Sequence, residues 1–155
     1  MRFRMLCGQG LVVVFLFATQ GTSDAQERQN EIARWSVGSI DPDPVACSAQ
    51  IDSVRQTLVD FNAPVSRQFA WVVLCNEKAW FRVKNSAAYR RVATNTGFTD
   101  FSNHVVYLKG FKQSAKDLRG TIGHEIGHQM CRCNDEFVAN QNKSTLQGSA
   151  QIARR

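Results

Sequence analysis

The sequence TIGHEIGHQMCRC, residues 121–133, predicts a helix that forms at an unusual energetic cost. Gly123 and Gly127 each destabilise a helix interior by about 1 kcal/mol relative to alanine. The same segment contains two of the chain's three histidines, His124 and His128. Because residues four apart lie one turn above the other on one face of a helix, both imidazoles point in the same direction. We therefore expect a site that the two rings share.

The spacing of the two histidines is that of a zinc site. Two imidazoles one helical turn apart can both bind one Zn²⁺ at about 2.0–2.1 Å. Helix geometry rotates Glu125 by about 100° from His124, so its carboxylate borders the site without having to be a ligand. A base that acts on a metal-activated water needs that position. His124, Glu125 and His128 together form the H-E-x-x-H pattern of zinc metallopeptidases.

Capping signals define the helix that carries this pattern. Ser114 is a good amino-terminal cap, and Asp117 follows three residues later, where an acidic side chain is favoured. We expect the helix to end near Cys133-Asn134 and a last helix to begin at Asp135. Gly123 and Gly127 would give the first helix a flat stripe that another backbone can approach closely. The polar chain from residue 141 onward is expected to fray.

Two apolar runs predict β-strands ahead of this helix. Residues 69–75 (FAWVVLC) form a continuous run of β-forming residues, which is typical of a central strand. Residues 104–108 (HVVYL) predict a second, shorter strand, and residues 97–103 a loop. Residues 77–95 are ambiguous, because 80–84 could be a strand while the residues after them look helical.

One more helix is predicted in the amino-terminal half. Apolar residues recur at helical spacing between 44 and 61, with Asp43 as the cap and Pro44 in the first turn. Asn62-Ala63-Pro64 should end this helix. Residues 26–40 predict a short helix or a loose arm.

The first 25 residues have the three-part layout of a secretory signal peptide. Arg2 and Arg4 give a positive start, and an apolar run follows from Leu11 to Ala18. Small residues then precede a predicted cut after Ala25. The apolar run is too short to span a bilayer. We expect an exported protein, secreted or periplasmic, without a stable membrane span after cleavage.

Cys47, Cys75, Cys131 and Cys133 lie beyond the predicted cut. An even number of cysteines in an exported chain suggests two disulfide bonds, and four cysteines allow three pairings. A bond between Cys131 and Cys133 would close a very small ring, so we expect each of them to pair with Cys47 or Cys75. Buried free thiols are the alternative.

The chain is basic, but its positive charge is dispersed. Its 155 residues contain 19 Lys and Arg against 13 Asp and Glu, a formal net charge of +6. A nucleic-acid-binding surface would need a local concentration of positive charge that the sequence lacks. We therefore expect no nucleic-acid partner.

The segment from His104 to Asn140 resembles the zincin clan of zinc metallopeptidases. The likeness rests on the strand at 104–108, where zincins place an edge strand beside the cleft, on the helix with T-I-G-H-E-I-G-H, and on the residues EFVAN at 136–140. In the gluzincin branch the third zinc ligand is a glutamate on the next helix, in a pattern like E-x-x-A/S-D. Glu136 fits that glutamate.

The resemblance implies a ligand set of His124, His128 and Glu136, with Asn140 in the place of the aspartate that orients a ligating histidine. Two departures stand out: the link between His128 and Glu136 is shorter than in most gluzincins, and Asn replaces Asp. Asp135 is the rival ligand, although capping the last helix is its expected role. Zincins with a ligand six residues after the second histidine would use Asn134 here, and an amide is a poor zinc ligand.

The resemblance also implies an α+β fold, a minimal zincin-like domain over residues 26–140 with a polar tail at 141–155. A small sheet would pack on the HExxH helix and on a short following helix. The implied function is an exported zinc-dependent peptidase that acts on a peptide or protein, with Glu125 as the general base. His104 and Tyr107 are the candidate donors to the oxyanion. Their strand could hold an extended peptide by β-addition.

Two other functions stay open. A closed structural zinc site could use His124, His128, Cys131 and Cys133 in a non-catalytic binding or assembly domain, although Glu125 would then have no role. Hydrolysis of a non-protein amide, such as a cell-wall link, is the third possibility, because the HExxH pattern does not distinguish between amide substrates.

Overall fold

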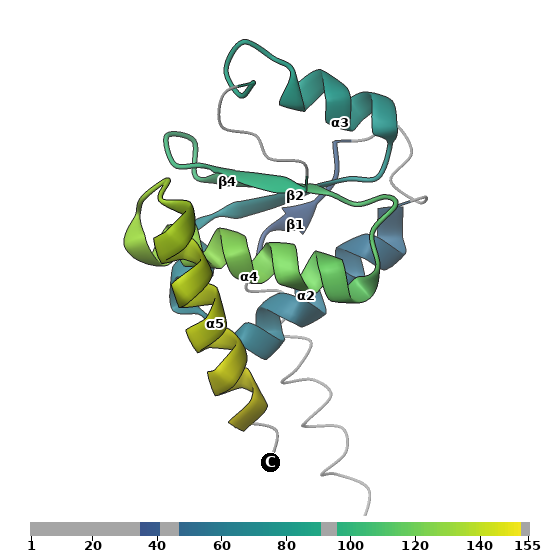
Figure 1. Ribbon diagram of the computed structural model, residues 1–155. Coiled ribbons are helices and arrows are strands. Elements are labelled where there is room, and N and C mark those ends of the chain that lie inside the picture. Colours follow the sequence, from purple (N-terminus) through teal and green to yellow (C-terminus); the bar gives the residue numbers. More distant parts are fainter. Residues whose placement is uncertain (1–34, 41–46, 91–95, 153–155) are drawn as a thin grey trace, which may run out of the picture.

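The apolar run at 69–75 forms β2, Ala70–Leu74, an inner strand of the sheet in the computed structural model (Figure 1). The structure describes residues 35–40, 47–90 and 96–152. Within them, four strands form one mixed sheet in the order β1-β2-β4-β3. The predicted central strand is confirmed.

The other strands frame β2 and define one edge of the sheet. β1, Val37–Gly38, and β4, Val105–Lys109, both run parallel to β2. β3, Gly97–Asp100, pairs antiparallel with β4 and lies at the sheet edge. The second predicted strand is thus confirmed as β4, but it is an inner strand, so the expectation that it forms the edge beside the cleft is wrong.

Helices cover both faces of this sheet, which confirms the predicted α+β class. One face is covered by α2, Ser48–Phe61, and α4, Ala115–Cys131, with α5, Glu136–Ile152, running obliquely across α4 (Figure 1). The opposite face carries α3, Glu77–Lys84. A short 3-10 helix, Pro64–Gln68, connects α2 to β2.

Alternation along the inner strands divides the buried side chains between the two faces. Val106 and Leu108 of β4 pack with Ile122 of α4, whereas Tyr107 between them packs with Phe98 of β3. Trp80 of α3 closes the second cluster. Tyr107 therefore faces away from the HExxH helix.

Two local predictions are wrong, and one ambiguity is resolved, for reasons that lie in hydrogen bonding. The predicted loop at 97–103 is wrong for residues 97–100, which pair with β4, and only residues 101–103 form a turn. Residues 80–84 are helical, since Asn76 caps α3 by accepting from the backbone N–H groups of Lys78 and Ala79. Residues 141–152 do not form the frayed end that was predicted, because α5 continues to Ile152.

The predicted helix at 44–61 forms as α2 but begins at Ser48. Asp43 and Pro44, its predicted cap and first turn, lie outside the described residues. It ends as expected, with Asn62 in the left-handed conformation at φ 45°. Residues 26–34 of the predicted arm are also outside the description, and Trp35 is buried with its indole N–H donating to Ser66.

The disulfide pairing differs from the prediction. Cys47 bonds to Cys75, which joins the start of α2 to the end of β2, and Cys131 bonds to Cys133. The expectation that Cys131 and Cys133 reach back to the other two is therefore wrong. Arg132 adopts a left-handed conformation at φ 51°, which folds the chain so that the two Cα atoms lie 5.2 Å apart, a normal disulfide distance.

The predicted signal peptide lies outside the described residues. Among the helices that the structure describes, none combines the length and the apolar character needed to cross a membrane.

A close backbone contact between α4 and α5 gives a reason for glycine in the HExxH helix. A Cβ atom added to Gly127 would overlap the carbonyl oxygen of Ala139 and lie 2.9 Å from its carbonyl carbon. We predict that Gly127→Ala lowers the free energy of unfolding by about 1–3 kcal/mol, because backbone atoms cannot yield as a flexible side chain can. Thermal unfolding followed by circular dichroism measures this.

Gly148→Ala is the matched control, since nothing lies within 4 Å of a Cβ at that position of α5. It should stabilise the protein by about 0.5–1 kcal/mol through helix propensity. A Gly127→Ala variant as stable as Gly148→Ala would contradict the close backbone contact.

Candidate metal site

Local capping interactions place the first two site residues. Ser114 caps α4, its Oγ accepting a hydrogen bond from the backbone N–H of Asp117 at 3.1 Å, as predicted. His124 and His128 follow on one face of α4, and their Nε2 atoms lie 3.0 Å apart. The predicted convergence of the two imidazoles is confirmed.

A tight connection returns the chain to these rings. After the left-handed Arg132, the side chain of Asp135 accepts from the backbone N–H groups of Phe137 and Val138 at 2.9 and 3.1 Å. Asp135 is therefore the cap of α5, which was its expected role. This cap places Glu136 in the first turn of α5.

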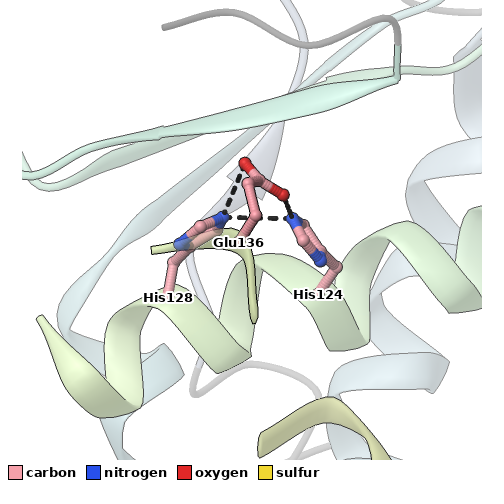
Figure 2. A group of neighbouring side chains, drawn as sticks. All are labelled: His124, His128 and Glu136. Atoms are coloured by element: carbon pink, nitrogen blue, oxygen red, sulfur yellow. Dashed lines mark hydrogen bonds and ion pairs between the residues drawn. The ribbon is translucent and has the colours of Figure 1, made fainter. Parts of the chain in front are cut away.

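His124, His128 and Glu136 form a group that could hold a metal ion (Figure 2). One Glu136 carboxylate oxygen lies 3.0 Å from Nε2 of His124, and the other lies 3.6 Å from Nε2 of His128. The side chain of Glu136 is 63% exposed, so one side of the group faces solvent.

The spacing of the two rings suits a tetrahedral ion. Ligand atoms held at about 2.0–2.1 Å from one zinc ion in a tetrahedron lie about 3.3 Å apart. The two Nε2 atoms lie 3.0 Å apart, close to that value, and one ligand atom from each of the three residues lies within 4.8 Å of the others. Two nitrogen donors and one carboxylate also match the ligand chemistry of zinc sites that keep an open position.

Asn140 orients the ring of His124. Its amide nitrogen donates to the backbone carbonyl of Glu136 at 2.8 Å, which leaves the amide oxygen to accept from Nδ1–H of His124 at 3.1 Å. The proton is thereby assigned to Nδ1, and Nε2 keeps the lone pair that a ligand needs. Asn140 occupies the orienting position that the sequence assigned to it.

The backbone orients the second ring. Nδ1–H of His128 donates to the carbonyl oxygen of Cys133 at 2.9 Å, and the Cys131–Cys133 disulfide constrains the turn that carries this carbonyl. Burial lowers the pKa of His128, and the neighbouring His124 lowers it further. The neutral ring is the form that binds metal.

Glu125 lies next to the group in a nearly water-free position. Only 1% of the residue is exposed. Burial raises the pKa of Glu125 to about 7, the negative charge of Glu136 adds to the increase, and a hydrogen bond from Thr99 opposes it. A carboxyl group with a pKa near 7 can both accept and release a proton at neutral pH.

Two residues of β3 that the sequence did not single out hold Glu125. The Thr99 hydroxyl donates to its carboxylate at 2.8 Å. Gly97 provides the space, because a Cβ there would lie 3.2 Å from a carboxylate oxygen of Glu125 and 3.0 Å from Thr121. The only signal in the sequence was the alternation of apolar and polar residues at 97–100, four residues before the strand that begins at 105. Four residues are too few to predict a strand from alternation.

A cavity of about 640 Å³ adjoins the group. His124 and Glu136 line it at one end, and the first two turns of α4 and the middle of α5 supply most of its other walls. A small ligand or part of a peptide could occupy this volume.

The two predicted oxyanion donors do not join the group. Tyr107 packs on the opposite face of the sheet, with its ring centroid 5.3 Å from that of Tyr89. The ring of His104 packs at a tilt against that of Phe69, with centroids 5.4 Å apart, and lines a different cavity, together with Gln129 and Arg132. Strand alternation turns Tyr107 away, and the left-handed backbone at His104 turns the chain between β3 and β4.

The alternative ligand set of two histidines and two cysteines does not form. Cys131 and Cys133 are bonded to each other, so neither offers a thiolate. A carboxylate, Glu136, occupies the place near the rings instead.

Comparison with known proteins identified no relative. Neither a protein family, nor a curated protein, nor a solved structure matched this chain. The geometry of the site is therefore the basis for any functional statement.

Exchange of Glu136 and of Asp135 tests the ligand assignment. We predict that Glu136→Gln weakens Zn²⁺ binding by at least about 100-fold, because an uncharged amide replaces one of three ligands. Asp135→Asn should leave binding within a few-fold of wild type, since asparagine also caps helices well. Competition with a chromophoric chelator measures both affinities, and the reverse order would assign the ligand to Asp135.

Proposed function

We propose that this chain is an exported zinc-dependent hydrolase of the zincin type that cleaves peptide bonds. The observation that supports this most directly is the convergence of His124, His128 and Glu136 beside a buried carboxylic acid, Glu125. Three ligands with one exposed side distinguish such a site from a closed structural one.

The metal and the protein have separate tasks in this proposal. When bound, Zn²⁺ supplies a Lewis acid that lowers the pKa of water and polarises a carbonyl oxygen. The imidazoles of His124 and His128 present Nε2 to the ion because Asn140 and the Cys133 carbonyl hold their Nδ1–H groups. The protein thus presents both rings in the ligating tautomer before the ion binds.

Glu125 is the proposed proton carrier. Its carboxylate takes a proton from the attacking water and delivers it to the leaving amine, which requires a group that exchanges protons near neutral pH. Thr99 holds one carboxylate oxygen by its hydroxyl, and β3 screens the group from bulk water. The hydrogen bond keeps the carboxylate in one orientation through both transfers.

Export is proposed from the amino-terminal pattern of the sequence. The two disulfides, Cys47–Cys75 and Cys131–Cys133, suit an oxidising compartment.

Glu125→Gln tests the proposed catalysis. Because glutamine cannot carry the proton, hydrolysis of a quenched fluorescent peptide library should fall by at least about 100-fold, while one Zn²⁺ per chain is retained. Mass spectrometry under native conditions measures the metal, and chelator treatment of wild type should abolish turnover reversibly. Turnover that persists in Glu125→Gln would refute the assigned base, and metal binding without any turnover in wild type would favour a non-catalytic zinc domain.

Thr99→Val tests the positioning of that base. Removal of the hydroxyl should lower kcat by about tenfold with little change in KM or in metal content, because only the orientation of Glu125 is affected. Thr99→Ser keeps the hydroxyl and should restore most of the activity. Equal activities of the valine and serine variants would show that the hydrogen bond does not matter.

A further inference from the structure

The cavity beside His124 and Glu136 is lined by a lysine that the proposed chemistry does not use. Lys143 of α5 lines it together with His124 and Glu136. The lysine is half-buried. In the part of the chain that the structure describes, no carboxylate forms an ion pair with its ammonium group.

Two glycines of α4 leave the space that the Lys143 side chain occupies. A Cβ at Gly123 would lie 3.4 Å from Cγ of Lys143, and a Cβ at Gly120 would lie 3.6 Å from its Nζ. The aliphatic part of the side chain therefore lies along the glycine face of α4, and the charge reaches the level of Gly120. Gly120 is one helical turn before His124, which corresponds to a rise of about 6 Å.

The other charges in the cavity leave Lys143 available. Asp117 is engaged at the helix start, where it accepts from Ser114 Oγ at 2.6 Å, and the hydrogen bonds of Ser114 hold the pKa of Asp117 below its usual value. Lys116 acts on the same carboxylate and is exposed. Glu136 is one of the three residues that could hold a metal ion, and a bound divalent ion would neutralise its negative charge.

We propose that Lys143 binds a carboxylate of the substrate, so that the site prefers peptides with an acidic group close to the bond that is cleaved. This inference rests on the proposed function and narrows its substrate class. A half-buried lysine on the wall of a cavity can form a stronger charge-assisted hydrogen bond than a fully exposed surface lysine does. The carboxylate can come from an acidic side chain or from the carboxyl terminus of a short peptide.

Binding to the metal-loaded Glu125→Gln protein tests this without turnover. The probes are Ac-Gly-Gly-Glu-Gly-Gly-NH2, the same peptide with Gln in place of Glu, and the Gln peptide with a free carboxyl terminus. Isothermal titration calorimetry should show that at least one carboxylate peptide binds about tenfold more tightly than the neutral amide. Which of the two gains affinity identifies the source of the carboxylate.

The Lys143→Met change, added to Glu125→Gln, should abolish that difference, since methionine keeps the apolar stem over Gly123 and removes the charge. Lys112→Met is the matched control: it removes the same charge from an exposed lysine that pairs with Glu77 outside the cavity, and it should keep the difference. Unchanged melting temperatures in both variants exclude a loss of fold.

Equal or unmeasurable affinities for the three peptides, or a preference that survives Lys143→Met, would overturn the proposal. Its failure is separable from that of the proposed function. Wild-type hydrolysis without a charge preference would leave the hydrolase intact and refute the role of Lys143. A Lys143-dependent preference in a protein without turnover would support the role of Lys143 and refute the hydrolase.

Discussion

The contact between Gly127 of α4 and the backbone of Ala139 in α5 is the constraint on which the site depends. Because Gly127 has only a hydrogen as its side chain, α4 can approach α5 until Gly127 lies directly against the backbone of Ala139. Asn142 strengthens the contact by donating to the Gly127 carbonyl at 3.1 Å. Glu136 lies one turn before Ala139, so the same contact determines how far its carboxylate is from His124 and His128. The steric demand of this contact explains why α4 carries glycine at 127 despite its low helix propensity.

The short connection between α4 and α5 has a second consequence. In the structure the residues that close the turn also position the ligands: the Cys133 carbonyl accepts from His128, and the Asp135 side chain caps α5 so that Glu136 lies in its first turn. The seven residues between His128 and Glu136 are therefore part of the site, because their backbone and side chains supply hydrogen bonds that a longer link would have to supply from elsewhere.

The environment of Glu125 is built by a segment remote from the helix in sequence. β3 contributes the Thr99 hydroxyl and the space above Gly97, and both depend on the antiparallel pairing of β3 with β4. Tertiary packing thus gives one carboxylate a dry position and leaves another, Glu136, open to solvent.

Local patterns in the sequence determined much of the helix that carries the site. Residue spacing was enough to predict the shared face of His124 and His128 and the central strand at 70–74. Side-chain hydrogen bonding within a few residues was enough to predict the caps at Ser114 and Asp135. Glu136 and Asn140 were assigned through one feature of the resemblance, the residues EFVAN at 136–140, and the structure brings both to the histidines.

Only the tertiary structure decided the features that depend on distant partners. The place of β3 at the edge, the direction of Tyr107 and the Cys47–Cys75 bond require knowledge of which strands pair and in which register. The Cys131–Cys133 bond depends on the left-handed conformation of Arg132, which no pattern in the sequence predicted. Lys143 lay in a segment expected to fray, and it became part of a cavity because α5 packs on α4 and stays helical to Ile152. Periodicity reports which face of an element is apolar, but the contacts that place a side chain beside another element arise only when the chain is folded.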